Sequence, residues 1–256
     1  MPVRPPKTAL ILSGGGMFGA WEAGAWQVLS QVLRPDWVIG ASAGSLNAWV
    51  IASGADPQEL VDRWLNLHMF EELRLRFPTG PTSSLLDPTP VHTGITEIFN
   101  AYKPKTNVGI TLTRIPSLRV EMVANEKITA QHLIASCAVP VLLPPVLLDG
   151  HWYWDGGLVD GLPHSFGREV GATRLVCLNV WVGLPWWWNL KGSLLHALER
   201  HRRKDQQVAS PAEWIYLAPP KMPGSFRDAA VWTRSNAQRW IDEGRKAGEL
   251  ALHHFE

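Results

Sequence analysis

The sequence predicts an α/β fold in which helices cover the faces of a mainly parallel sheet. Short apolar strands alternate with helical segments through the first third of the chain, and each strand there runs into a glycine-rich turn that opens a helix. Hydrophobic residues make up 46% and charged residues 18%, which excludes a disordered or fibrous chain. No low-complexity linker or internal repeat divides the chain, so we expect a single domain over residues 1–256.

The elements follow from the spacing of apolar residues and from turn residues at their ends. In the first third we expect a strand over residues 8–12, a helix that begins at residue 17 and is closed by residues 34–35, a strand over 37–39, a helix from 44 to about 53 and a helix that starts at Asp56. Further along we expect strands over 108–112, 118–123, 175–180 and 214–217 and helices over 128–138 and 235–252. Residues 70–90 contain clustered proline, glycine and serine, which indicates a loop or lid.

Charge and cysteine content limit the possible partners and the compartment. Lys plus Arg is 24 and Asp plus Glu is 23, so the net charge of +1 offers no overall field for nucleic acid, and we expect no such partner. The two cysteines suit a reducing compartment. The longest apolar stretch, residues 139–148, is short and contains prolines, so we expect no membrane-spanning segment. These features predict a cytoplasmic protein.

The sequence Gly40-x-Ser42-x-Gly44 lies between the second predicted strand and the helix that follows it. A nucleophile at such a turn is strained and exposed, and small neighbours give the turn room. The positive end of the following helix favours negative charge that develops nearby. The bare pattern is also that of a flexible turn, but its position between strand and helix favours Ser42 as a nucleophile.

A second glycine-rich turn, Gly14-Gly15-Gly16-x-x-Gly19, joins the first strand to the first helix. Consecutive glycines allow backbone N–H groups to point at one centre, where they bind a phosphate or the oxyanion of an acyl intermediate. The same residues satisfy the dinucleotide fingerprint G-x-G-x-x-G, which makes a nucleotide-binding oxidoreductase an alternative. That alternative requires an acid at the end of the second strand, whereas Asp36 precedes this strand.

The third candidate motif is Asp155-Gly156-Gly157. A nucleophilic serine needs a base within about 2.6–3.2 Å, and a carboxylate becomes a stronger base in a dry site. The two glycines permit a turn that presents the carboxylate closely to another part of the backbone. Taken alone, the pattern is that of an ordinary Asp-Gly turn.

Together and in this order, the three motifs resemble those of the patatin-like phospholipase family. The similar segments are SGGGMFG for the glycine-rich loop, GASAGS for the nucleophile turn, ASCAVPVLLPPV at residues 135–146, and YWDGGLVDGLP for the base. The resemblance implies a three-layer α/β/α sandwich and hydrolysis of lipid acyl esters without a metal or cofactor. The site residues that it implies are the nucleophile Ser42, its general base Asp155 and the oxyanion-hole glycines Gly14, Gly15 and Gly16.

Phe18 departs from the family pattern, which often has Arg or Lys at this position. A cation there would add charge to the anion site, so Phe18 bears on the preference for phospholipid. Separately, a non-catalytic lipid-binding protein of the same fold is a further alternative to a hydrolase. A Ser-His-acid triad would need one of the nine histidines, such as His164 or His196, but no HGGG-type segment accompanies them. No cluster of histidines or carboxylates has the spacing of a metal site.

Tryptophan is unusually frequent, with 14 residues, and three consecutive tryptophans precede an amphipathic stretch that ends in a run of basic residues. Trp with a basic face suits a bilayer interface, which predicts peripheral membrane contact. The alternative is a surface helix packed by its leucines with a solvated basic run. The residues concerned are Trp186, Trp187, Trp188, Arg200, Arg202, Arg203 and Lys204.

Overall fold

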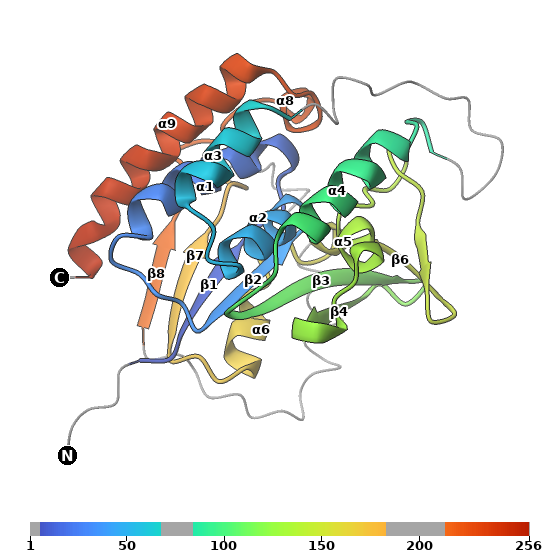
Figure 1. Ribbon diagram of the computed structural model, residues 1–256, viewed down its shortest axis with the longest axis horizontal. Helices are drawn as coiled ribbons and strands as arrows, with labels where there is room; N and C mark the ends of the chain where they lie inside the picture. Colours follow the sequence, from blue (N-terminus) through green and yellow to red (C-terminus); the bar gives the residue numbers. More distant parts are fainter. Residues whose placement is uncertain (1–5, 68–83, 183–212, 256) are drawn as a thin grey trace.

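The computed structural model describes residues 6–67, 84–182 and 213–255. They form a three-layer α/β sandwich around one mixed sheet (Figure 1). The eight strands of this described sheet are β1 (Thr8–Leu12), β2 (Trp37–Ala41), β3 (Asn107–Ile115), β4 (Arg119–Ala124), β5 (Val146–Leu148), β6 (His151–Asp155), β7 (Arg174–Leu178) and β8 (Glu213–Leu217).

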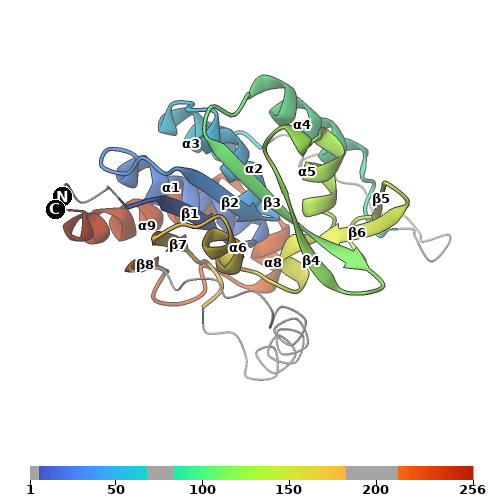
Figure 2. The same ribbon diagram turned by 90° about the horizontal axis from the view of Figure 1, so that it is seen from below.

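Most described helices lie on one face of the sheet, and α6 lies on the other (Figure 2). On the first face α1 packs along α9, while α2, α4 and α5 contact one another over the middle of the sheet. The α-helices are α1 (Gly19–Leu29), α2 (Ala43–Ala52), α3 (Pro57–Leu65), α4 (Thr89–Ala101), α5 (Ala130–Ser136), α6 (His164–Glu169), α8 (Phe226–Ala230) and α9 (Arg234–Ala251). Short 3₁₀ helices are η1 (Gly16–Phe18), η3 (Asn125–Lys127), η4 (Gly156–Leu158) and η5 (Leu252–His254).

The strand order is β5-β6-β3-β2-β1-β7-β8, with β4 paired to β3 outside this path. Strands β3, β2, β1, β7 and β8 run parallel, which confirms the parallel sheet that the alternating pattern predicts. The remaining strands pair antiparallel to their neighbours, because β4 and β6 both oppose β3 and β5 opposes β6. The sheet is therefore parallel through its β3–β8 part and antiparallel at the β5 end.

Strand β3 has two different strands along one of its edges. Thr111 pairs with Ala41, the last residue of β2, and the next residue, Leu112, pairs with Asp155, the last residue of β6. Both residues also pair with β4, so β4 occupies the opposite edge and β2 and β6 share the first one. Because β2 is parallel and β6 antiparallel to β3, their carboxyl ends meet head to head.

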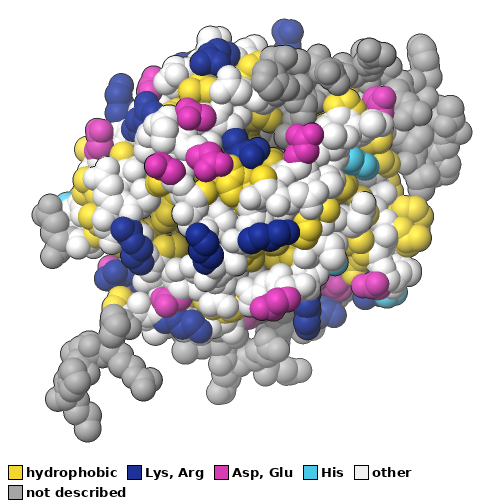
Figure 3. Space-filling model, in the orientation of Figure 1, with side chains coloured by type: hydrophobic (Ala, Val, Ile, Leu, Met, Phe, Trp, Pro, Cys, Tyr) yellow, Lys and Arg dark blue, Asp and Glu magenta, His cyan; other side chains and the backbone are white. Residues whose placement is uncertain are grey.

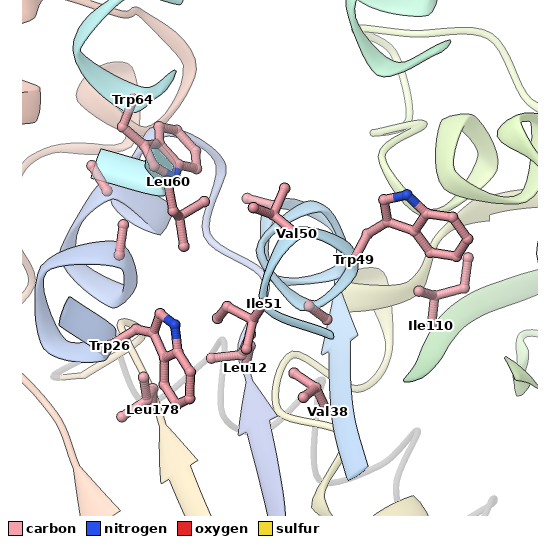
Figure 4. Packing of buried hydrophobic residues seen from close by; sticks show 14 of the residues in the cluster. Leu12, Trp26, Val38, Trp49, Val50, Ile51, Leu60, Trp64, Ile110 and Leu178 are labelled. Atoms are coloured by element: carbon pink, nitrogen blue, oxygen red, sulfur yellow. The ribbon is translucent and has the colours of Figure 1, made fainter. Parts of the chain in front are cut away.

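The core lies mainly between the sheet and the larger helical layer. Leu10 and Leu12 of β1 belong to that cluster, whereas Ala9 and Ile11 face the α6 side, as the period of two in a strand requires. Several tryptophans fill this core rather than the surface, and Trp26, Trp49 and Trp64 are among them (Figure 4). Each large apolar side chain buried in this way stabilises the fold by about 1.5–3 kcal/mol.

The main difference from expectation lies in the region of residues 84–169. Helix α4 begins at Thr89, inside the stretch expected to be a loop, and its flanking Pro88 and Pro90 occupy helix-start positions that tolerate proline. Strand β5 and helix α6 are short and were not expected. Residues 68–83, which include most of the expected lid, lie outside the described residues.

No helix in the described ranges is long and apolar enough to cross a membrane. On the face seen in Figure 3, charges of both signs are interspersed with apolar side chains, in keeping with the net charge of +1. The tryptophans at residues 186–188 and the basic run at 200–204 lie outside the described residues, so membrane contact through them stays a prediction. The single domain and the cytoplasmic location also stay predictions.

Candidate active site

Ser42 occupies a strained turn between β2 and α2. Its φ and ψ are 52° and −127°, a conformation that non-glycine residues rarely adopt, and it occupies the N-cap position of α2 without a side-chain capping bond. The flanking glycines are required by close backbone contacts. A Cβ at Gly40 would lie 2.1 Å from the carbonyl oxygen of Gly44, and a Cβ at Gly44 would lie 2.4 Å from that of Ser13.

The backbone of Ser42 is held from two sides. Its amide donates to Oγ of Ser136 on α5, 3.2 Å away, and this hydroxyl donates in turn to the carbonyl of Thr111 on β3 at 2.9 Å. The carbonyl of Ser42 accepts from both the amide and the hydroxyl of Ser45. Ser136 was not predicted as a site residue, and the only signal for it is its place in the ASCAVP segment.

Asp155 ends β6, and its backbone is fixed by β3 and by the segment after α5. Its amide donates to the carbonyl of Ala138 at 3.0 Å, and its carbonyl accepts from Oγ1 of Thr113 at 2.8 Å. Gly156 follows because the chain passes close to β3, where a Cβ would lie 2.1 Å from the carbonyl oxygen of Thr111. The next amide, that of Gly157, donates to Oδ1 of Asp155 at 2.7 Å.

The head-to-head arrangement of β2 and β6 places the Asp155 carboxyl beside Ser42. Both side chains are buried, with 4% and 7% exposed, respectively. Burial raises the pKa of Asp155 to about 7, while the hydroxyl of Ser42 and the amide of Gly157 lower it. Oδ2 of Asp155 is buried and has no partner of regular hydrogen-bond geometry among the described residues, although Ser42 is near enough to affect the pKa.

The glycine-rich loop lies against the same pair of residues. A Cβ at Gly14 would lie 3.3 Å from Cβ of Ser42, so the backbone approaches the serine closely. The amide of Gly14 donates to the carbonyl of Gly161 at 2.9 Å. In the part of the chain that is described, the amides of Gly15 and Gly16 have no such partner. Of the three predicted oxyanion donors, only Gly14 therefore has its amide engaged by another described residue.

An apolar cavity of about 570 Å³ opens onto this cluster. Ser42, Asp155 and the three loop glycines line one part of it, and no histidine of the described residues lines it. Its walls come from α2, α3, α4, the segment after α5, and α8. The apolar side chains of these walls include Leu46, Val50, Leu60, Val91, Ile95, Ile98, Leu142, Leu143 and Phe226. Such a cavity accepts an apolar ligand with few polar contacts.

The dinucleotide alternative loses its ribose contact in this structure. Asp36 lies at the amino end of β2, where its carboxylate accepts from the amide of Thr8 at 2.7 Å. The glycine loop follows the carboxyl end of β1. Because β1 and β2 are parallel neighbours, Asp36 and the loop lie at opposite ends of these strands. In the described ranges, no three His, Cys, Asp or Glu side chains are grouped as a metal site would need.

The patatin-like phospholipase family model matches residues 10–166. The chain belongs to the patatin-like phospholipase family. It is 26% identical over 184 residues to "Patatin-like phospholipase domain-containing protein 6" of Mus musculus and of Homo sapiens. These alignments cover 67% of this chain but only 13% of the curated relatives.

Among solved structures, VipD from Legionella pneumophila has the same fold, with a TM-score of 0.55 at 15% identity. The match covers 98% of this chain and 67% of that one. In this patatin-like chain Phe18 is fully buried, and its ring packs edge-on against Trp240 at a centroid distance of 5.0 Å. The position where the family often has a cation therefore belongs to the core here.

Proposed function

We propose that the chain is a serine hydrolase that cleaves carboxylic ester bonds of lipids, with Ser42 as nucleophile and Asp155 as general base. The observation that carries this proposal is the buried Asp155 carboxyl beside a serine on a strained strand-to-helix turn. Membership of the patatin-like phospholipase family supports a lipid ester as substrate. The apolar cavity that opens onto both side chains supports an acyl chain as the part that is bound.

In the first half of the reaction, Ser42 attacks the ester carbonyl and Asp155 takes its proton. Oδ2 of Asp155 is the acceptor, since Oδ1 already holds the amide of Gly157. A carboxyl whose pKa is near 7 is a stronger base than an exposed aspartate and is still about half ionised at neutral pH. The acyl group then forms an ester with Ser42, and Asp155 returns the proton to the departing alcohol.

In the second half, Asp155 takes a proton from water, which attacks the acyl-serine. The bond to Oγ of Ser42 then breaks, Asp155 returns the proton to this oxygen, and the fatty acid is released. In both halves the carbonyl oxygen gains negative charge. In this proposal the amides of Gly15 and Gly16 stabilise it, together with the positive N-terminus of α2, and the lack of a backbone acceptor for these two amides among the described residues supports that role. The amide of Gly14 already donates to the carbonyl of Gly161, so we assign this residue no oxyanion contact. Its role is to let the loop backbone approach Ser42 closely.

Two substitutions and one label test the proposal. Ser42→Ala and Asp155→Asn are expected to abolish hydrolysis of a p-nitrophenyl ester while the protein stays folded, and a fluorophosphonate is expected to label the peptide that contains Ser42. Ser53→Ala is the matched control, because Ser53 is also a buried serine of the α2 region, and its hydroxyl bonds only nearby backbone, the carbonyl of Val50 and the amide of Ala55. Full turnover by Asp155→Asn would exclude the dyad.

The same measurements distinguish the hydrolase from a non-catalytic lipid-binding protein. A lipid-binding protein would sediment with liposomes and release no fatty acid, and its Ser42 would not react with the fluorophosphonate.

Peripheral membrane contact through Trp186, Trp187, Trp188 and the basic run is a separate proposal. It predicts that serine at the three tryptophan positions reduces sedimentation with anionic vesicles but leaves hydrolysis of a soluble ester unchanged.

A further inference from the structure

Glu22 is a carboxylic acid in the core of the protein. It lies in α1 within the first turn, and its side chain is 0% exposed. A buried carboxyl is costly unless its oxygens are hydrogen-bonded, so a residue of this kind needs an explanation. Glu22 does not line the cavity, and the reaction described above does not use it.

Two neighbours of Glu22 are both oriented as hydrogen-bond donors. Asn47 donates from Nδ2 to Oε2 of Glu22 at 3.0 Å, and the hydroxyl of Ser13 donates to Oε1 at 3.1 Å. The indole N–H of Trp64, which can only donate, occupies Oδ1 of Asn47 at 2.9 Å and so turns its NH₂ group toward Glu22. The amide of Val180 donates to Oγ of Ser13 at 3.1 Å, which leaves the hydroxyl hydrogen for Glu22.

These two donors belong to the two parts of the candidate site. Ser13 is the residue before Gly14, at the start of the glycine-rich loop. Asn47 lies on α2, the helix that has Ser42 at its N-terminus, and it also lines the cavity. Trp64 on α3 packs above α1 near Leu60 (Figure 4), so the same network reaches the cavity wall. Glu22 is therefore the common acceptor between loop and helix.

We propose that Glu22 is a positioning residue of the Ser42 site, whose carboxylate fixes the start of the oxyanion loop relative to the nucleophile helix. The inference rests on the proposed function, because it concerns the geometry between Ser42 and the amides of Gly15 and Gly16. A carboxylate accepts from both donors at once. A protonated acid or an amide must donate toward one of them, and the hydroxyl hydrogen of Ser13 then loses its acceptor.

Burial raises the pKa of Glu22 to about 8, and the hydrogen bonds from Asn47 and Ser13 lower it in part. The elements packed against α1 are α2, α3, α9 and η1, and no charged side chain of their described residues contributes to this shift. The uncharged groups that face the carboxyl are Asn47 and Ser13. The complete pattern of hydrogen bonds therefore forms as the pH rises through about 8.

The test compares the pH profiles of the full chain and Glu22→Gln. The amide resembles the protonated acid, so kcat of the two proteins should agree at about pH 6.5. At about pH 9.5 kcat of Glu22→Gln should be lower by about fivefold, the rate effect of one lost hydrogen bond, with KM unchanged. Glu213→Gln is the matched control, because Glu213 pairs with Arg174 at the β7–β8 edge of the sheet and should follow the wild type throughout.

A second variant keeps the test independent of how Glu22→Gln folds. Ser13→Ala removes the hydroxyl through which Glu22 reaches the loop, so it should show the same deficit at high pH. The double variant should then be no slower than Ser13→Ala alone, since both changes break one connection. Additive losses would show that Glu22 does not act through Ser13 and would overturn the inference.

The outcomes separate the two proposals. A loss in Glu22→Gln by the same factor at every pH would mean a packing role only, and a profile identical to the wild type would mean no role. Either result overturns the inference while the hydrolase function stands. If the wild type and Ser42→Ala hydrolyse esters equally, the proposed function fails, and the positioning role of Glu22 falls with it.

Discussion

Replacing Gly16 by alanine is expected to reduce catalysis far more than stability. Gly16 has a φ of +56°, and a Cβ on it would lie 2.1 Å from the carbonyl oxygen of Ala229 on α8. The left-handed conformation costs a non-glycine residue roughly 1–2 kcal/mol. The contact with Ala229 is with backbone, so no rotamer change relieves it and the loop must move. Loss of an oxyanion donor costs about 3–4 kcal/mol, which lowers kcat by about 10²–10³.

Gly54→Ala is the matched control, because it carries the same conformational cost without the collision. Gly54 has a φ of +73°, and the nearest atom to its added Cβ would be Cδ of the flexible Lys105 side chain, 3.8 Å away. Gly54→Ala should therefore lose about 1–2 kcal/mol in the free energy of unfolding, measured in urea, and Gly16→Ala at least as much. Only Gly16→Ala should lose kcat for a p-nitrophenyl ester.

The refuting result is a comparison between these two variants. If kcat of Gly16→Ala stays within about twofold of kcat of Gly54→Ala, the amides of the loop do not stabilise the transition state. If Gly54→Ala loses kcat by the same large factor, the loss reflects general destabilisation. Labelling by a fluorophosphonate gives a second readout, because phosphonylation of Ser42 also places negative charge in the hole.

Three further predictions concern pH, substrate length and stability. The rate of fluorophosphonate labelling should rise with pH through about 7, because Asp155 must be ionised to accept the proton, and a rate independent of pH between 5 and 9 would contradict that role. For p-nitrophenyl esters, kcat/KM should rise by up to about fourfold per methylene, since each buried CH₂ contributes ~0.8 kcal/mol, and Val50→Phe in the cavity wall should move the optimum to shorter chains than in the wild type. Between pH 5 and 8 the Glu22 carboxyl binds more protons in the folded than in the unfolded state. The free energy of unfolding in urea should therefore fall as the pH rises, by up to about 1.4 kcal/mol per pH unit more in the wild type than in Glu22→Gln. Equal slopes for the two proteins would show that Glu22 titrates normally.

The parallel part of the fold was predictable because each strand there is a short apolar run that ends in a local turn signal. Residues 8–12 and 37–39 were predicted as strands, and β1 and β2 begin and end within two residues of these bounds. Both are buried on two faces, which leaves a continuous apolar run in the sequence. The helix start at Asp56 was equally clear, because its carboxylate caps Gln58 with Pro57 in the first turn.

The antiparallel end of the sheet was not predictable by the same reasoning. Strand β5 has only three residues at the end of the proline-containing apolar stretch 139–148, and β6 has five with exposed His151 and Trp152, so neither stands out in the sequence as a separate buried strand. Their position depends on pairing with β3, which starts some 40 residues earlier in the chain. The DGG motif could be read from the sequence, but its place on the edge of β3 beside Ser42 comes from this long-range pairing.

The same limit applies to the groups that hold the site. Ser136 contacts the Ser42 amide across 94 positions, and the amide of Gly14 reaches the carbonyl of Gly161. These bonds depend on which backbone groups the fold leaves unpaired, and a single sequence carries no signal for that. A motif therefore predicts which residues bear the chemistry, whereas the supporting hydrogen bonds decide which of their atoms remain free for it.

The two buried acids show how this arrangement trades stability for chemistry. Burial raises the pKa of both Asp155 and Glu22, so each binds a proton more tightly in the folded than in the unfolded chain. Ionising either one therefore destabilises the fold as the pH rises. An apolar residue at either position would avoid that cost. Among the described residues Oδ2 of Asp155 has no hydrogen-bond partner, and its carboxyl lies close enough to Ser42 for the hydroxyl to affect its pKa. Glu22 joins the loop to the nucleophile helix. Both costs therefore arise where the proposed reaction needs a strong base and a fixed geometry.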